Sequence, residues 1–155
     1  MRPRAIIFEE VESLRNLLTV ALRDRNYDVC SFADPSICPL YNDSRCTCPQ
    51  EFPCGDLLIL DNNFPRMSGL ELIQRHVEKG CKGPVTNTAI MSDNWSAEDL
   101  ETARNLGCKI FEKPFRFKDF SDWLDSREKT FDPQRKIGDL PNMKSAGPTS
   151  DHRRL

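Results

Sequence analysis

Five polar residues of this 155-residue chain stand at the ends of short apolar runs, and their types suit chemistry on a phosphoryl group. They are Glu9, Glu10, Asp61, Ser92 and Lys113. Three carboxylates held close together would raise one another's pKa values unless a cation lay among them. Mg²⁺ fits that need, because it prefers oxygen ligands. A carboxylate nucleophile, a hard cation, an ammonium group and a hydroxyl together describe phosphoryl transfer onto an aspartate.

The elements that must position these residues are predicted to alternate between strand and helix. Apolar or alternating runs at 5–8, 27–32, 57–60, 85–92 and 108–113 predict five strands. Helical spacing of apolar residues follows at 11–25, 70–79, 96–107 and 117–124. This alternation predicts an α/β fold, with a parallel sheet covered by helices on both faces. The carboxyl ends of parallel strands meet at one rim, so we expect the five polar residues to meet there.

Taken in order, these motifs resemble the receiver domain of two-component response regulators. The matching motifs are Glu9-Glu10, Asp61 followed by the run to Pro65 and Gly69, Ser92, and the run Phe111-Glu112-Lys113-Pro114-Phe115. The resemblance covers roughly residues 4–127. It implies a flavodoxin-like (βα)5 doubly wound sheet with strand order 2-1-3-4-5.

The resemblance also implies roles for the residues at the rim. Asp61 would accept a phosphoryl group from a sensor histidine kinase. Mg²⁺ would be held by Glu10, Asp61 and the backbone carbonyl of Asn63, with Glu9 holding a metal-bound water. Ser92 and Lys113 would contact the phosphoryl oxygens.

Two further expectations follow from the resemblance. The Lys113-Pro114 peptide bond would be cis, and Phe111 would be the aromatic residue that moves with the hydroxyl on phosphorylation. The face formed by the fourth helix, fifth strand and fifth helix would then change its protein partners. Such a protein is not an enzyme in the turnover sense, although it assists its own phosphorylation and dephosphorylation.

The sequence departs from the usual receiver pattern in its acidic pair. That pair is usually Asp-Asp or Glu-Asp, and the extra methylene of Glu10 would shift a bound cation, which can reduce a rate about 100-fold. The leading hypothesis is a single-domain response regulator, with a receiver at 1–130 and a disordered tail at 131–155. The alternative is a degenerate receiver that serves as an adaptor or as a thiol- or metal-responsive sensor. A flavin-binding enzyme has less support, because no phosphate loop follows the first strand.

Residues 36–55 form a cysteine-rich insertion that we expect to replace or distort the second helix. Its four cysteines, Cys38, Cys46, Cys48 and Cys54, have the spacing C-x₇-C-x-C-x₅-C, which matches no standard zinc or ferredoxin pattern. Binding of Zn²⁺ or an iron–sulfur cluster, reducible disulfides and unpaired thiols all remain open. Cys30 and Cys108 are interpreted as small core residues, and His76 as a solvated one.

The net charge of −2 implies no strong attraction to nucleic acid or to a membrane surface. The first residues contain no signal-peptide core, and no apolar run approaches the length of a membrane span. We therefore expect a cytoplasmic protein that binds neither nucleic acid directly nor a membrane. A homodimer stays possible.

Overall fold

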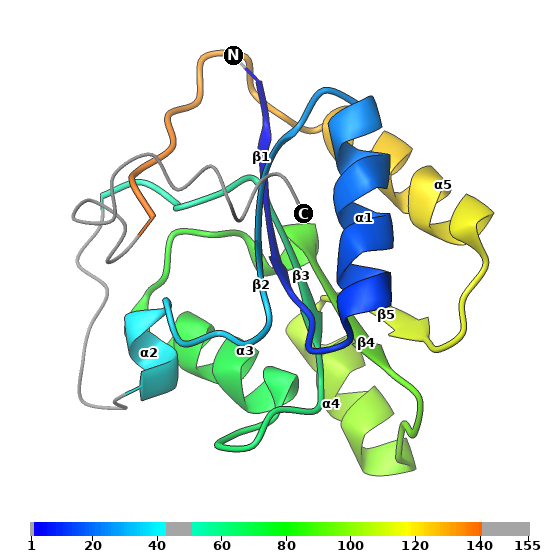
Figure 1. Ribbon diagram of the computed structural model, residues 1–155. Helices are drawn as coiled ribbons and strands as arrows, with labels where there is room; N and C mark the ends of the chain where they lie inside the picture. Colours follow the sequence, from blue (N-terminus) through cyan, green and yellow to red (C-terminus); the bar gives the residue numbers. More distant parts are fainter. Residues whose placement is uncertain (1, 43–50, 141–155) are drawn as a thin grey trace.

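The computed structural model describes residues 2–42 and 51–140 of the chain. Five strands form one parallel sheet in the order β2-β1-β3-β4-β5 (Figure 1), which confirms the predicted order. The strands are β1 Arg4–Phe8, β2 Asp28–Phe32, β3 Leu57–Asp61, β4 Thr88–Ser92 and β5 Lys109–Glu112.

Helices cover both faces of this sheet, as Figure 1 shows. They are α1 Glu12–Asp24, α2 Pro39–Asn42, α3 Gly69–Lys79, α4 Ala97–Leu106 and α5 Phe117–Glu128. The side chains of α1 and α5 pack on one face, and those of α2, α3 and α4 pack on the other. This is the doubly wound arrangement that the alternating pattern predicts.

Alternate residues of each strand enter the two cores. Ile7 and Ile59 are register partners and belong to the α1/α5 core, whereas Ile6 and Leu60 belong to the core beneath α2, α3 and α4. All four side chains are buried. Burial on both faces explains why these strands read as continuous apolar runs instead of alternating ones.

The helix ends follow local sequence signals. The hydroxyls of Ser68 and Ser96 accept hydrogen bonds from the backbone N–H groups of Glu71 and Asp99, at 3.1 and 3.0 Å, and so cap α3 and α4. Gly107 ends α4 in the left-handed conformation, with φ of 88°, which a glycine adopts without steric cost.

Two segments differ from the sequence-based expectation, whereas the described part of the insertion agrees with it. Residues Val85–Asn87 form a 3-10 turn, so β4 begins only at Thr88. The insertion contains one helical turn, α2, and residues 43–50 lie outside the described ranges.

No helix within residues 2–42 and 51–140 is both long enough and apolar enough to cross a membrane.

The second difference concerns the segment after α5, which the sequence assigns to a disordered tail. Residues 131–140 instead return along the amino end of β1 (orange in Figure 1), and Leu140 is buried in the core beneath α2, α3 and α4. Polar side chains fix this path: Arg135 pairs with the buried Asp56. The folded unit therefore extends at least to Leu140, while residues 141–155 are not described.

Gly69 provides a test of how tightly the turn after β3 is packed. A Cβ atom at Gly69 would lie 2.5 Å from the backbone oxygen of Asp61 and 3.2 Å from the Cα of Asn62, and neither backbone atom can move cheaply. We expect Gly69→Ala to lower the free energy of unfolding by about 2–3 kcal/mol, as overpacking does, in a urea titration. Gly83→Ala is the control, because its Cβ would meet only Cys81 Sγ, at 3.8 Å. Equal effects of the two substitutions would contradict this account.

Candidate functional site

Three of the predicted residues meet at the carboxyl end of the sheet. Lys113 Nζ lies 2.8 Å from Glu9 Oε1 and 3.4 Å from Asp61 Oδ1. Glu9 is fully buried, Asp61 is 4% exposed, and the Lys113 side chain is 17% exposed. The ammonium group thus bridges two buried carboxylates at the ends of the neighbouring strands β1 and β3.

Strand geometry brings these three side chains to the same face. Ile7, Ile59 and Phe111 point into the α1/α5 core, and the three site residues each follow one of them by two positions, which is one full side-chain period of a strand. Backbone hydrogen bonds extend the ladder past the strand ends. The N–H of Glu9 donates to Phe32 O at 3.0 Å, and that of Lys113 donates to Ser92 O at 2.8 Å.

The turn after Asp61 is fixed by the neighbouring residue. Asn62 Oδ1 accepts a hydrogen bond from the Leu70 N–H at 3.0 Å, and its backbone oxygen accepts one from the Gly69 N–H at 3.0 Å. Asn62 therefore ties the start of α3 to the end of β3. The sequence reading did not single it out, because a lone asparagine after a strand carries no distinctive pattern.

The two members of the acidic pair lie in different environments. Glu9 Oε2 accepts a hydrogen bond from the Val11 N–H at 2.9 Å, and Glu9 Oε1 faces Lys113. Glu10 is exposed, and its backbone oxygen lies 3.3 Å from Arg15 Nη1. Within the described ranges, no group of three His, Cys, Asp or Glu side chains is close enough to hold a metal ion. The structure thus brings Glu9 to Asp61 but does not complete a three-acid cluster with Glu10.

The single positive charge of Lys113 does not balance the negative charges of Glu9 and Asp61. Burial raises the pKa of Asp61, and the nearby Glu9 raises it further, while Lys113 and the backbone N–H of Asn63 oppose the rise. For Lys113, burial lowers the pKa, but the hydrogen bonds and charges of Glu9 and Asp61 together outweigh it, and the pKa is raised. Two negative charges therefore face one positive charge in a site with little solvent.

Ser92 ends β4 and Phe111 lies within β5, as predicted. The contacts of both side chains are with residues outside the Glu9–Lys113–Asp61 cluster. The buried Ser92 hydroxyl donates to Asn94 Oδ1 at 2.9 Å and accepts from the Asn94 N–H at 3.2 Å. Phe111 is 3% exposed and contacts the rings of Phe115, Phe120 and Trp123. Its ring is therefore packed against α5.

Trp95 is a second residue that the sequence reading missed. Its indole N–H donates to Phe111 O at 3.0 Å and so links the loop after β4 to β5. The sequence signal that could have identified Trp95 is the presence of a tryptophan within an otherwise polar loop. The Lys113-Pro114 peptide bond is cis, as the resemblance implies.

The structure confirms the predictions for some of the cysteines and leaves those for others untested. Cys30 and Cys108 are buried as predicted, and Cys46 and Cys48 lie outside the described residues. Cys38 and Cys54 line one cavity, without a metal-binding cluster in the described ranges, so the Zn²⁺ or iron–sulfur expectation gains no support. His76 differs from the prediction of a solvated side chain: its Nε2 lies 3.4 Å from Cys38 Sγ, and burial lowers the pKa of His76 to about 4.

Comparison with known proteins identifies the fold. No family model matches the sequence, and no curated protein matches it. Solved structures do match. The non-phosphorylated HemR receiver domain from Leptospira biflexa is 24% identical, with a TM-score of 0.65, and the match covers 86% of this chain and 99% of that domain. The chain has the receiver-domain fold.

Other receivers show the same likeness at lower identity. The chemotaxis protein CheY4 of Vibrio cholerae is 20% identical, with a TM-score of 0.59, over 81% of this chain and 98% of that one. The receiver domain of the sensor histidine kinase PA1611 from Pseudomonas aeruginosa is 15% identical, with a TM-score of 0.62, over 84% of this chain and all of that domain. That receiver carries a magnesium ion in its active-site cleft.

The raised pKa of Asp61 makes the contribution of this residue to the free energy of unfolding depend on pH. The folded state holds the Asp61 proton more tightly than the unfolded state, so the ionised carboxylate destabilises the fold at neutral pH. We expect Asp61→Asn to increase the free energy of unfolding at pH 7. The gain should shrink as the pH falls through the raised pKa and vanish below the ordinary aspartate pKa.

Urea titrations of both proteins between pH 7 and pH 3 measure this difference. Asp93→Asn is the matched control, because Asp93 is an exposed aspartate one residue after Ser92. A gain that is absent at pH 7, or that grows in acid, would show that Asp61 is not destabilised by its surroundings.

Proposed function

We propose that this chain is a cytoplasmic response regulator that accepts a phosphoryl group on Asp61 from a sensor histidine kinase. The observation that carries the proposal is the buried Glu9–Lys113–Asp61 cluster at the carboxyl end of a receiver-fold sheet. A buried carboxylate with raised pKa beside a single ammonium group is a typical mark of a functional site.

In this proposal, an Asp61 oxygen attacks the phosphorus of a phosphohistidine. The new bond joins Asp61 to phosphorus, and the phosphorus–nitrogen bond breaks as the imidazole leaves with its electron pair. Lys113 already lies 3.4 Å from Asp61 Oδ1, so its ammonium group would neutralise charge on the transferred group. The Ser92 hydroxyl would turn from Asn94 and donate to a phosphoryl oxygen.

The residues present fit a divalent cation by charge and by atom type. Glu9 Oε1 and Asp61 Oδ1 are buried and, within the described ranges, have only the Lys113 ammonium group beside them. These oxygens are suitable ligands for Mg²⁺. Asp61 and the Asn63 carbonyl would hold the ion, with Glu9 holding a metal-bound water. Glu10 would complete the ligand set only by turning inward from its exposed position. When bound, Mg²⁺ supplies the positive charge that the two carboxylates and the incoming phosphoryl oxygens lack.

The signal would leave through the face formed by α4, β5 and α5. A groove on this face is lined by Lys109, Phe115, Arg116, Asp119 and Trp123, among others. Phe111 also lines it and lies two residues before Lys113, so a change of charge at the site can reach the groove through β5. A downstream protein partner, or a second copy of the chain, would bind there.

Phosphorylation is testable with a small donor. We expect incubation with acetyl phosphate and Mg²⁺ to add one phosphoryl group to the intact protein, detected by mass spectrometry. Asp61→Asn removes the nucleophilic oxygen and should abolish the gain, whereas Asp93→Asn should keep it. A gain that persists in Asp61→Asn would place the phosphoryl group elsewhere.

Magnesium binding can be measured without phosphorylation. A ligand that binds only the folded state stabilises it by about 2.7 kcal/mol at 100 times its Kd. We therefore expect Mg²⁺ to raise the urea midpoint of the wild-type protein and of Asp93→Asn, but not that of Asp61→Asn. Equal effects on all three proteins would show that the ion acts elsewhere on the surface.

The degenerate-receiver alternative rests on one observation, the exposed Glu10 outside the Glu9–Asp61 cluster. An adaptor of this kind would use the receiver fold and the α4–β5–α5 face without phosphorylation. It predicts neither a phosphoryl gain nor a magnesium effect, so the two experiments above separate it from the leading proposal.

A further inference from the structure

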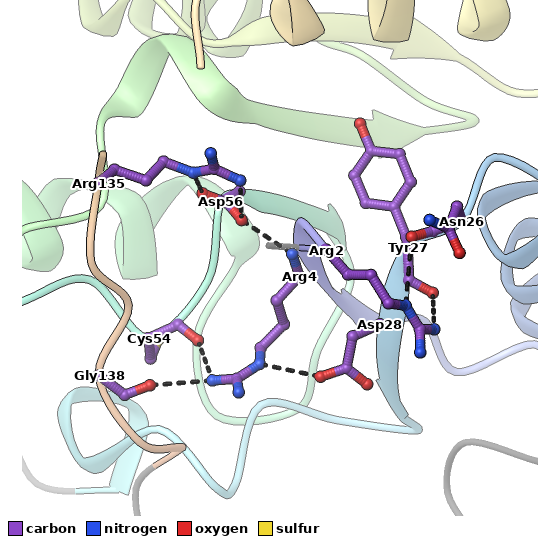
Figure 2. A network of polar contacts seen from close by, with 9 residues as sticks. All are labelled: Arg2, Arg4, Asn26, Tyr27, Asp28, Cys54, Asp56, Arg135 and Gly138. Carbon is purple, nitrogen blue, oxygen red and sulfur yellow. Dashed lines mark hydrogen bonds and ion pairs between the residues drawn. The ribbon is translucent and has the colours of Figure 1, made fainter. Parts of the chain in front are cut away.

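Residues 131–140, called the C-terminal strap here, are fastened to the amino end of the sheet (Figure 2). Arg135 forms an ion pair with both carboxylate oxygens of Asp56, one of them at 3.1 Å from Nη2. Arg4 Nη1 donates to Gly138 O at 2.9 Å and to Cys54 O at 3.1 Å. The Gly138 N–H donates to Pro53 O at 2.8 Å. The strap is therefore tied directly to the segment that carries Cys54.

The anchor of the strap is a buried carboxylate. Asp56 is 6% exposed, and its Oδ2 also accepts the backbone N–H of Arg4 at 2.8 Å. The Arg135 guanidinium packs over the Phe131 ring, 4.8 Å from its centroid. A bidentate pair of this kind fixes geometry as well as charge. In the described part of the chain, the strap forms no helix or sheet ladder. Besides the side chains named above, the Gly138–Pro53 backbone bond and the Lys136 ammonium group over the Phe52 ring hold it.

A cavity of about 70 Å³ lies where the strap ends. Leu140 forms part of its wall and is 7% exposed. The other walls combine apolar side chains with three cysteines and one histidine from separate segments, namely Cys38, Cys54, His76 and Cys81. Within this cavity, Cys38 Sγ and His76 Nε2 are 3.4 Å apart.

The cavity chemistry suits a soft, apolar electrophile. Its lining is mostly apolar, and burial keeps His76 neutral near pH 7. A neutral imidazole beside Cys38 can accept a hydrogen bond from the thiol and so orient the sulfur towards a bound electrophile. When the thiol adds across an activated carbon–carbon double bond, a sulfur–carbon bond forms as the carbon–carbon π bond breaks. The thiol proton passes to the neighbouring carbon, so no group leaves.

We propose that the C-terminal strap is a releasable cover over a thiol site for such electrophiles, remote from Asp61. The strap opens by loss of the Arg135–Asp56 pair and withdrawal of Leu140, without unfolding of the sheet. Segments held by few contacts open locally at lower free energy than the core. Cys30 and Cys108 lie in the core, so their exposure requires a larger opening.

Pulse labelling with N-ethylmaleimide tests the proposal on the reduced full chain. Peptide mapping by mass spectrometry gives a labelling rate for each cysteine. We expect Arg135→Ala, which removes the cationic partner of the buried Asp56, to speed labelling of Cys38 and Cys54 roughly 10-fold or more. Gln134→Ala is the control, because the Gln134 side chain is exposed next to Arg135.

Cys30 and Cys108 report whether the whole domain has opened. Their rates should stay at the wild-type value in Arg135→Ala. Leu140→Ala, which keeps the ion pair but removes the side chain from the cavity wall, should also speed labelling of Cys54 and provides the test if Arg135→Ala does not fold. Unchanged rates at Cys38 and Cys54, or an equal rise at Cys30 and Cys108, would overturn the proposal.

Discussion

The Lys113 ammonium group, placed between two buried carboxylates, is the interaction on which this structure depends. Burying an unpaired carboxylate costs several kcal/mol, so Glu9 and Asp61 can both sit at the end of the sheet only because a cation lies between them. That compensation is incomplete, because one ammonium group faces two carboxylates. The parallel sheet makes the arrangement possible by bringing the ends of β1, β3 and β5 to one rim.

Strand β3 has a buried aspartate at each end, and the two serve different purposes. Asp56, just before the strand, has both oxygens engaged by Arg135 and one also by the Arg4 N–H. Asp61, the last residue of the strand, shares its cation with Glu9 and has a raised pKa. A satisfied carboxylate stabilises structure, whereas an undercompensated one retains the capacity to bind a cation or to react. The same residue type thus anchors the C-terminal strap at one end and offers chemistry at the other.

The fold places the two adjacent glutamates, Glu9 and Glu10, in different environments. Glu9 continues the face of Ile7 and turns inward, where its longer side chain reaches both Lys113 and the Val11 N–H. Glu10 is the next residue and remains exposed. The inward position is therefore set by strand periodicity, and the two glutamates are not interchangeable.

The sequence by itself predicted the alternation of strands and helices and the rim positions of Asp61 and Lys113, because periodicity and strand ends are local signals, whereas the order of the strands came from the family resemblance. It did not determine which glutamate turns inward, the Ser92–Asn94 contact, or the hydrogen bond from Trp95 to β5, since each depends on side-chain direction in three dimensions. The path of residues 131–140 was decided only by tertiary structure. A polar segment without periodicity reads as a tail, and its order comes from Arg135 meeting Asp56, a contact between residues 79 positions apart that no local pattern encodes.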